Sequence, residues 1–234
     1  MKPLRPFFSY YGSKWYAARF YPVPRYDLLV EPFAGSAGYS LRHHERDVVL
    51  VERYPLLVAL WSWLIAVEPE EILALPDVEP GQRVDELDVR PEARSLIGFW
   101  CNIATEKPRK QLGAWARKAT HQLVWGRRVR ERVAAQVEAI RHWTVVEASW
   151  DELPDAECTW FVDPPYDSRV GRQYVYGVVD HAALGAWCRL RSGQVIACEN
   201  VGATWLPFEP LRVVKGQVKN GIQKWSAEAV WTSG

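Results

Sequence analysis

The sequence predicts an α/β fold whose centre is a doubly wound, mostly parallel sheet. Short apolar runs alternate with segments of helical periodicity, which is the pattern of β-α-β units. Two of these runs end in an acidic residue, and a glycine-containing turn directly follows the first, at the edge where such folds bind ligands. With 234 residues, the chain is long enough for one domain with a modest insert.

The first half of the sheet is expected in residues 1–66. Asp27–Pro32 is the first apolar strand, and the small residues after it predict a glycine turn that opens a helix. Asp47–Glu52 is a second apolar strand, followed by an amphipathic helix over Pro55–Ala66. An acid at the end of the second strand is where α/β nucleotide folds bond ribose hydroxyls, so Glu52 is the candidate for that contact.

The glycine turn restricts the class of ligand. Gly35 and Gly38 are separated by two residues, which does not match G-x-G-x-x-G, and no Walker lysine follows. This pattern disfavours a pyrophosphate ligand and argues against a nicotinamide dehydrogenase. It favours an adenosine-containing ligand without phosphates, of which S-adenosylmethionine is the common one.

Residues 67–143 differ in composition from the rest of the chain. An acidic segment broken by prolines comes first, with a short helix expected near Ile72. From Pro91 to about Trp143 the spacing is helical and the composition basic, with aromatic residues interleaved, which indicates contact with a nucleic-acid backbone. The expected contacts are Lys107, Arg109, Lys110, Arg117, Lys118, Arg127, Arg128 and Arg130. The candidates for stacking on bases are Trp100, Trp115 and Trp125.

The sheet resumes after this insert. Strands are expected at Thr144–Glu147, Cys158–Val162 and Gln194–Cys198. A helix from about His181 to Arg191 precedes the last of them. Two consecutive prolines follow Val162 and cannot donate to a sheet, so the middle strand must end there in a rigid tip.

That tip, Asp163-Pro164-Pro165-Tyr166, carries a carboxylate, a free carbonyl and an aromatic ring. Together these groups suit the binding of a planar heterocycle with an exocyclic amine. Asp163 and the Pro164 carbonyl each accept one amino hydrogen, and Tyr166 stacks on the ring. The expected catalytic residues are therefore Asp163, Pro164, Pro165 and Tyr166.

Four segments, in this order along the chain, resemble the Dam-like family of DNA adenine methyltransferases. They are Arg5–Lys14, Glu31–Gly38, the acid Glu52 and Asp163–Tyr166, and Val213–Trp231 is similar to the closing hairpin of that family. The resemblance implies a Rossmann-like, S-adenosylmethionine-dependent methyltransferase sheet with a mostly helical DNA-recognition insert. It divides the chain into a catalytic domain, residues 1–66 and 144–234, and a target-recognition insert, residues 67–143.

The resemblance also implies roles for individual residues. Tyr10 and Lys14 would hold the methionine part of S-adenosylmethionine, and Asp151 would meet its adenine. Tyr10 and Glu52 stand where the family usually carries Trp and Asp, and they keep an aromatic ring and an acid. The expected cofactor-binding residues are Tyr10, Lys14, Glu31, Pro32, Phe33, Gly35, Gly38, Glu52 and Asp151.

The activity that the resemblance implies is site-specific N6 methylation of a flipped-out adenine in double-stranded DNA, with S-adenosylmethionine as methyl donor. Three alternatives stay open: methylation of cytosine N4, methylation of an amino group in RNA, and a non-catalytic DNA-binding role. Neither the target sequence nor the oligomeric state follows from the residues.

Composition adds further expectations. The net charge is only +1, so any polyanion site depends on local clustering of charge. The four cysteines lack C-x-x-C spacing and lie in apolar contexts, which predicts buried free thiols and no metal site. The longest apolar run is too short to span a bilayer, and no signal pattern opens the chain. We therefore expect a cytoplasmic protein acting on DNA in a bacterial or phage-infected cell.

Overall fold

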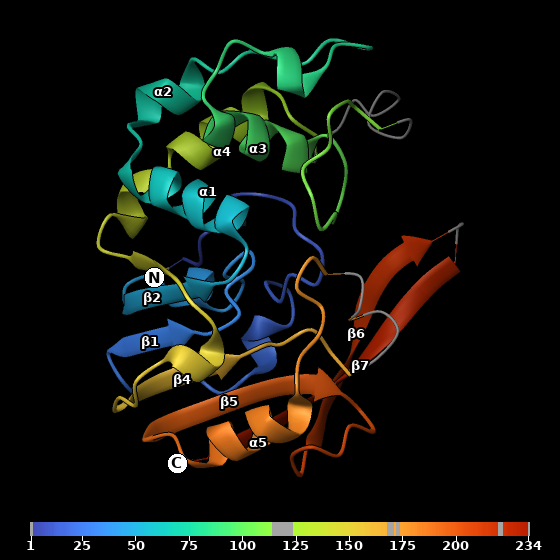
Figure 1. Cartoon of the computed structure of the whole chain (residues 1–234). Helices are drawn as coiled ribbons and strands as arrows, with labels where there is room; N and C mark the ends of the chain where they lie inside the picture. Colours follow the sequence, from blue (N-terminus) through green and yellow to red (C-terminus); the bar gives the residue numbers. More distant parts are fainter. Residues whose placement is uncertain (1, 114–123, 168–170, 172–173, 220–221, 234) are drawn as a thin grey trace.

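A mixed seven-stranded sheet forms the centre of the computed structural model, which describes residues 2–113, 124–167, 171, 174–219 and 222–233 (Figure 1). The strands lie in the order β3-β2-β1-β4-β5-β7-β6. Their bounds are β1 (Leu28–Glu31), β2 (Asp47–Glu52), β3 (Thr144–Glu147), β4 (Cys158–Val162), β5 (Gly193–Asn200), β6 (Glu209–Lys219) and β7 (Ile222–Ser233). The protein thus has the mixed α/β architecture that its sequence predicts.

The first five strands are parallel, and the last two form an antiparallel hairpin whose β7 pairs with β5. The chain runs outward from β1 through β2 to β3 and then returns to place β4 on the other side of β1. In open α/β sheets, ligands bind beyond the carboxyl ends of the strands at such a switch point. The gap between the ends of β1 and β4 is therefore the position where a site is expected.

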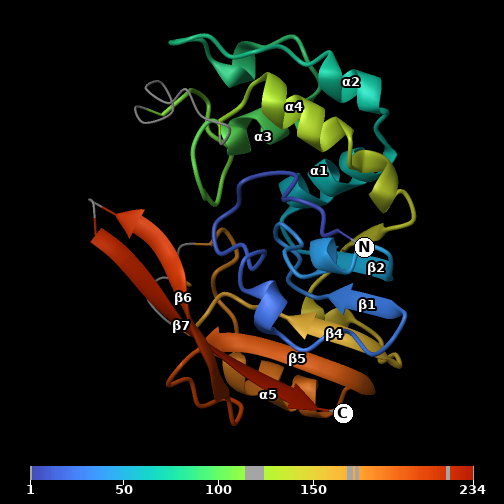
Figure 2. The same cartoon turned by 180° about the vertical axis from the view of Figure 1, so that it is seen from behind.

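Helices of two kinds complete the described structure. The α-helices are α1 (Pro55–Ala66), α2 (Pro69–Leu73), α3 (Pro91–Trp100), α4 (Arg127–Ala134) and α5 (His181–Arg189). The 3-10 turns are η1 (Ala18–Phe20), η2 (Ser40–Arg42), η3 (Val84–Glu86), η5 (Val137–Ile140) and η6 (Trp150–Glu152). Figure 2 shows α5 against one end of the sheet and the other four α-helices gathered above its opposite end.

Two hydrophobic cores lie on opposite faces of the sheet, because successive strand residues point to opposite sides. Leu29 and Phe161 belong to the core that α1 and α3 cover. Their neighbours Val30 and Trp160 belong to the core that α5 covers through Leu184 and other side chains. Helices on both faces explain why these strands are apolar throughout rather than alternating.

Most predicted elements form at the predicted residues. β2, β3, β4 and α1 have the predicted bounds, and α5 ends two residues early, at Arg189. The helix predicted after the glycine turn is wrong, since only the 3-10 turn η2 forms there. Gly35 and Ala37 adopt φ values of 48° and 52°, which an α-helix cannot contain.

Residues 67–143 form three short α-helices, joined in the described part mainly by irregular chain and 3-10 turns. The short helix near Ile72 is confirmed as α2, and the helical spacing predicted from Pro91 to Trp143 gives α3, α4 and η5 among the described residues of that range. Buried residues of α3 and α4, including Ile97 and Val133, share one core with α1 and the sheet. The insert is therefore packed onto the sheet rather than folded apart from it.

Candidate functional site

Two adjoining pockets lie at the carboxyl ends of β1, β2 and β4. They enclose about 330 and about 580 Å³ of space that no protein atom fills, part of it open to solvent. The residues that line both are Tyr10, Phe33, Gly35 and Tyr174. Because the pockets share these walls, they form one continuous cleft at this edge of the sheet.

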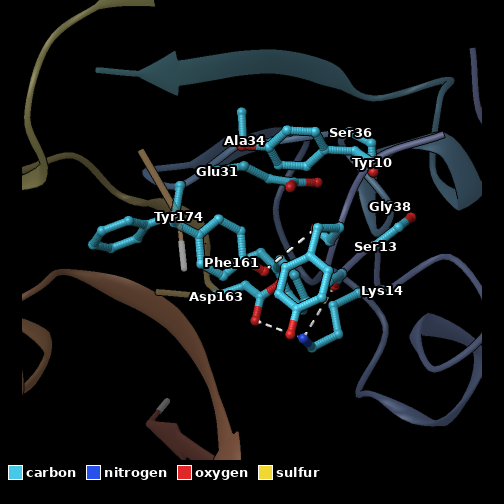
Figure 3. A pocket seen from close by; sticks show the side chains of 14 residues that line it. Tyr10, Ser13, Lys14, Glu31, Ala34, Ser36, Gly38, Phe161, Asp163 and Tyr174 are labelled. Atoms are coloured by element: carbon cyan, nitrogen blue, oxygen red, sulfur yellow. Dashed lines mark hydrogen bonds and ion pairs between the residues drawn. The ribbon is translucent and has the colours of Figure 1, made fainter. Parts of the chain in front are cut away.

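The first pocket is built around a buried ion pair. Lys14 Nζ lies 3.0 Å from Asp163 Oδ1, and Figure 3 shows the two side chains pointing toward one another. Lys14 also donates to the Gly12 carbonyl at 3.3 Å and lies 4.5 Å from the ring centroid of Tyr166. Asp163 Oδ1 has no well-aligned hydrogen-bond donor among the described residues. The attraction between the Lys14 ammonium and this carboxylate is therefore mainly electrostatic. The carboxylate keeps its capacity to accept hydrogen bonds from a ligand.

Burial and charge act against each other on this pair. Burial raises the pKa of Asp163 to about 6, and the Lys14 ammonium limits that rise. For Lys14, burial lowers the pKa, but Asp163 and Glu228 more than offset this and the pKa is raised overall. Lys14 is therefore charged, and Asp163 is mostly ionised at neutral pH.

Glu31 is a second buried acid of the first pocket. Its Oε1 accepts from the Ser40 amide at 2.7 Å and from the Ser40 hydroxyl at 2.6 Å. Burial raises the pKa of Glu31 to about 8, although both Ser40 bonds lower it. A cationic group that entered the pocket would favour the ionised form of this carboxyl.

The second pocket contains Glu52, at the end of β2 as predicted. Its two oxygens accept from the backbone amides of Gly35 at 3.1 Å and Tyr54 at 3.0 Å. Burial raises the pKa of Glu52, and these amides lower it. The bonds fix the carboxylate at the pocket wall, where each oxygen retains a lone pair for a ligand hydroxyl.

Of the other predicted cofactor-binding residues, some line the pockets and one does not. Pro32 and Phe33 line the second pocket and Tyr10 lines both. Asp151 lies in η6 with an exposed side chain and lines neither pocket, whereas its neighbour Trp150 lines the second. The role of Asp151 in adenine binding therefore stays a prediction, and Trp150 is the residue of η6 that lines the cleft.

Gly35 and Gly38 line the first pocket but have different structural roles. Gly35 needs its positive φ of 48°. A Cβ on Gly38 would lie 2.6 Å from the Trp15 amide nitrogen and 2.9 Å from that of Lys14. The second glycine therefore allows the segment that carries Lys14 to pack directly on the glycine turn.

The Asp163–Tyr166 tip runs along both pockets. Asp163 lines the first and Pro165 the second, while His181 Nε2 lies 2.9 Å from the Pro165 carbonyl. The Pro164 carbonyl accepts no hydrogen bond from the described residues. Pro164 is buried and lines neither pocket, so its role as the second acceptor stays a prediction.

Tyr166 is anchored by its hydroxyl rather than free. The phenol donates to Glu228 Oε2 at 2.7 Å, and Tyr21 donates to the same oxygen at 3.1 Å. Lys14 covers one ring face, and Tyr166 lines neither pocket. Stacking on a base stays a prediction that requires the other face of the ring.

The predicted phosphate-contacting residues divide into three groups. Arg117 and Lys118 lie outside the described residues. Acids of the insert pair with three others: Lys110 with Asp85 at 3.2 Å, Arg127 with Glu131 at 2.6 Å, and Arg130 with Asp77. Lys107, Arg109 and Arg128 are exposed and have no ion pair with a described residue.

Two of the three candidate stacking residues belong to the core. Trp100 and Trp125 are buried, and their indole N–H groups donate to the carbonyls of Phe7 and Pro76, both at 2.8 Å. Neither therefore presents a free face to a base. Trp115 lies outside the described residues.

Ser36, Tyr174 and Glu228 are functional candidates outside the predicted catalytic, cofactor-binding and DNA-binding residues, although Tyr174 belongs to a loop that the sequence predicts near the flipped base. Ser36 Oγ is buried in the first pocket without a hydrogen-bond partner among the described residues. Tyr174 lines both pockets, and Glu228 reaches the site from β7. Ser36 was recognisable from its place in the glycine turn, but the other two are brought to the site only by tertiary folding.

The described residues contain no group of three His, Cys, Asp or Glu side chains placed to hold a metal. The four cysteines are buried and free, as predicted. Nor does the part of the chain that is described include a helix long and apolar enough to cross a membrane.

No family model matches the chain, and no curated protein matches it. Among solved structures, it is similar to a conserved hypothetical protein from Streptococcus pyogenes at 15% sequence identity. That match has a TM-score of 0.31 and covers 87% of this chain and 84% of the other. A likeness at this level says nothing about activity, so the site must be interpreted from its own chemistry.

Proposed function

We propose that the protein is an S-adenosylmethionine-dependent methyltransferase that acts on the exocyclic amine of adenine in double-stranded DNA. One observation carries the proposal: Asp163, at the end of β4, lines a cleft that the glycine turn and Glu52 also line, and the adjacent Pro164 carbonyl accepts no hydrogen bond from the described residues. Two adjacent acceptors match the two hydrogens of an amine. The Dam-like order of segments along the chain agrees with this assignment.

The cleft residues fit the proposed cofactor. Ser36 Oγ is a buried polar atom with no partner among the described residues, which calls for a ligand atom. Glu31 offers a buried carboxyl to an ammonium group, and the Lys14 ammonium offers a charge to a carboxylate. In the second pocket, Glu52 suits ribose hydroxyls and Trp150 offers an aromatic surface for adenine. The zwitterionic end and the nucleoside end thus find matching groups in the two pockets.

Asp163 has the central chemical role in the proposal. The amine of adenine is a poor nucleophile because its lone pair is delocalised into the ring. Hydrogen bonds to Asp163 and the Pro164 carbonyl draw the nitrogen toward tetrahedral geometry and free the lone pair. When bound, S-adenosylmethionine supplies an electrophilic methyl group on a sulfonium. The amine's surplus proton then leaves to the Asp163 carboxylate or to water.

Cytosine in DNA and amino groups in RNA are the rival substrates, because the same two acceptors bind any planar amine. A non-catalytic DNA-binding role is the third alternative. The buried Lys14–Asp163 pair argues against it, since burying two charges is costly and a binding protein has no need for them.

The test is transfer of tritiated methyl from S-adenosylmethionine to unmethylated duplex DNA, followed by nucleoside digestion and chromatography. We expect label in N6-methyldeoxyadenosine. Label in methylcytosine would change the substrate base, and label in RNA alone would change the nucleic acid. Cofactor binding without transfer to any of them would support the non-catalytic role.

Asp163→Ala separates chemistry from binding. We expect this variant to lose turnover by at least about a hundredfold, the usual scale for a group acting only in the transition state. Cofactor affinity, measured by calorimetry, should change little. Near-normal transfer by the variant would show that Asp163 does not have the proposed role.

A further inference from the structure

A cluster of three arginines without acidic partners lies outside the predicted DNA-contacting residues. Arg5, Arg42 and Arg132 form no ion pair with any carboxylate in the described part of the chain. By contrast, three of the predicted DNA-contacting residues, Lys110, Arg127 and Arg130, are paired with acids. We call these three residues the arginine cluster.

Aromatic rings hold the arginine cluster together. The guanidinium carbons of Arg5 and Arg42 lie 4.8 and 5.8 Å from the ring centroid of Trp15. The guanidinium carbon of Arg132 lies 4.8 Å from the centroid of Trp100. Stacking on an aromatic face orients a guanidinium while leaving its N–H edge free to bind.

Backbone contacts bring Arg132 next to Arg5. Gln136 accepts from the Arg5 amide at 2.7 Å and donates to the Arg5 carbonyl at 3.2 Å. Gln136 follows α4, four residues after Arg132, so both lie on one side of this segment. Figures 1 and 2 both show the N-terminal segment passing between the helical insert and the sheet.

The guanidinium of Arg132 has no anionic partner among the described residues. Its Nε and Nη2 atoms are buried and have no hydrogen-bond partner among the described residues. Burial and the nearby Arg5 both lower the pKa of Arg132. Gathering like charges is unfavourable unless an anion joins them, and guanidinium edges match phosphate oxygens.

We propose that the arginine cluster binds backbone phosphates of the DNA whose base enters the cleft, through contacts of Arg5 and Arg42 and with the charge of the partly buried Arg132 beside them. This inference rests on the proposed function and adds a contact surface that joins the N-terminal segment and η2 to α4 of the insert. The position agrees, because Trp15 directly follows Lys14: one segment carries Lys14 into the first pocket and Trp15 to the arginine cluster. Tyr16 beside it is 64% exposed and presents a ring next to the charges, as nucleic-acid surfaces often do.

The experiment measures binding of a fluorescent unmethylated duplex by anisotropy between 50 and 300 mM salt. The variants are Arg5→Gln, Arg42→Gln and the double variant, in the full-length protein. Each lost phosphate contact should reduce the slope of log affinity against log salt by about 1. Arg83→Gln is the matched control, since Asp85 and Glu86 already neutralise Arg83, and its slope should equal that of the parent.

Two checks keep the result interpretable. S-adenosylmethionine affinity should be unchanged in every variant, because neither Arg5 nor Arg42 lines a pocket. Arg132→Gln should reduce the slope as well, with folding verified by its melting temperature.

Each outcome has a separate meaning. Parent-like slopes for the Arg5 and Arg42 variants, with tight DNA binding by the parent, would overturn the arginine cluster and leave the proposed function intact. A parent that binds no duplex DNA would contradict the proposed function itself. If the variants show a reduced salt dependence of binding to RNA or to an acidic protein, but a parent-like salt dependence of binding to DNA, then DNA is not the ligand of the arginine cluster.

Discussion

Lys14 and Asp163 share one buried site, and each sets the protonation of the other. The resemblance to the Dam-like family implies that Lys14 would hold the cofactor, while the structure adds an ion pair with the catalytic candidate. The ammonium limits the rise that burial causes in the pKa of Asp163, which is about 6. Lys14 is therefore placed both to contact a ligand and to keep Asp163 ionised at neutral pH.

Lys14→Met should shift the pH dependence of turnover. Without the ammonium the pKa of Asp163 rises above 6, so the carboxylate needed for hydrogen bonding forms only at higher pH. At saturating cofactor, the acidic limb of kcat against pH should move upward by about one unit or more. Lys110→Met removes an exposed lysine and should leave the limb in place. An unchanged limb in Lys14→Met would contradict this role.

Glu31→Gln should alter stability in a pH-dependent way. The pKa of Glu31 is raised from 4.5 to about 8, so the folded state binds its proton more tightly than the unfolded state does. Its contribution to stability is complete below pH 4.5 and is lost as pH rises through about 8. Without cofactor, the difference between the melting temperatures of the variant and the parent should therefore increase in favour of the variant as pH rises from 5 to 8.5. The difference in unfolding free energy is on the order of a few kcal/mol, and a constant difference would contradict the shift.

At the scale of elements, the glycine turn and the Lys14 segment form one packed unit. Gly38→Ala would place a Cβ 2.6 Å from the Trp15 amide nitrogen. Because both partners are backbone, we expect a loss of about 1–3 kcal/mol in unfolding free energy, measured with urea, and weaker cofactor binding. Gly126→Ala is the control, since nothing lies within 4 Å of its Cβ position and its backbone is extended. Equal stability of the two variants would refute the packing role.

The hairpin takes part in the site through Glu228 on β7. Its Oε2 fixes the Tyr166 hydroxyl, so it is a positioning residue for the catalytic tip. Glu228→Leu should lower kcat roughly tenfold to a hundredfold, the cost of a misplaced group, with little change in KM for the cofactor. Glu228→Gln keeps a carbonyl acceptor and should restore most of the rate. If both variants turn over like the parent, the tip does not depend on β7.

At the scale of the whole molecule, some basic residues of the insert are neutralised by nearby acids, whereas the arginine cluster is not neutralised by any described acid. The acidic segment that follows α1 folds back so that Asp77 and Asp85 neutralise basic residues of the insert. The arginine cluster receives no such compensation within the described structure. A net charge of +1 therefore coexists with a locally positive surface.

The shared core makes a whole-molecule prediction about unfolding. Leu96 in α3 is fully buried in the core that also contains sheet residues. Leu96→Ala should cost about 2–5 kcal/mol and lower the midpoint of one common urea transition. Tryptophan fluorescence and far-UV circular dichroism should report that same midpoint. Leu73→Ala, at a 48% exposed position of α2, should cost far less. Two separate transitions would mean that the insert folds independently.

The sequence by itself determined the strands, the helix α1 and the acids that end β1 and β2. These follow from local periodicity and from the inability of prolines to continue a strand, so short-range chemistry suffices. It also placed Asp163, Glu31 and Glu52 at one edge, because the carboxyl ends of parallel strands meet there.

Only the tertiary structure decided which side chains meet within that edge. It turned Trp150 rather than Asp151 inward, paired Lys14 with Asp163, and brought Glu228 to Tyr166 across 62 residues of chain. It also paired Arg130 with Asp77 and Arg141 with Glu68, both far apart in sequence, and left the arginine cluster without a carboxylate partner among the described residues. Such contacts depend on the side-chain packing of segments far apart in sequence, which no local pattern encodes.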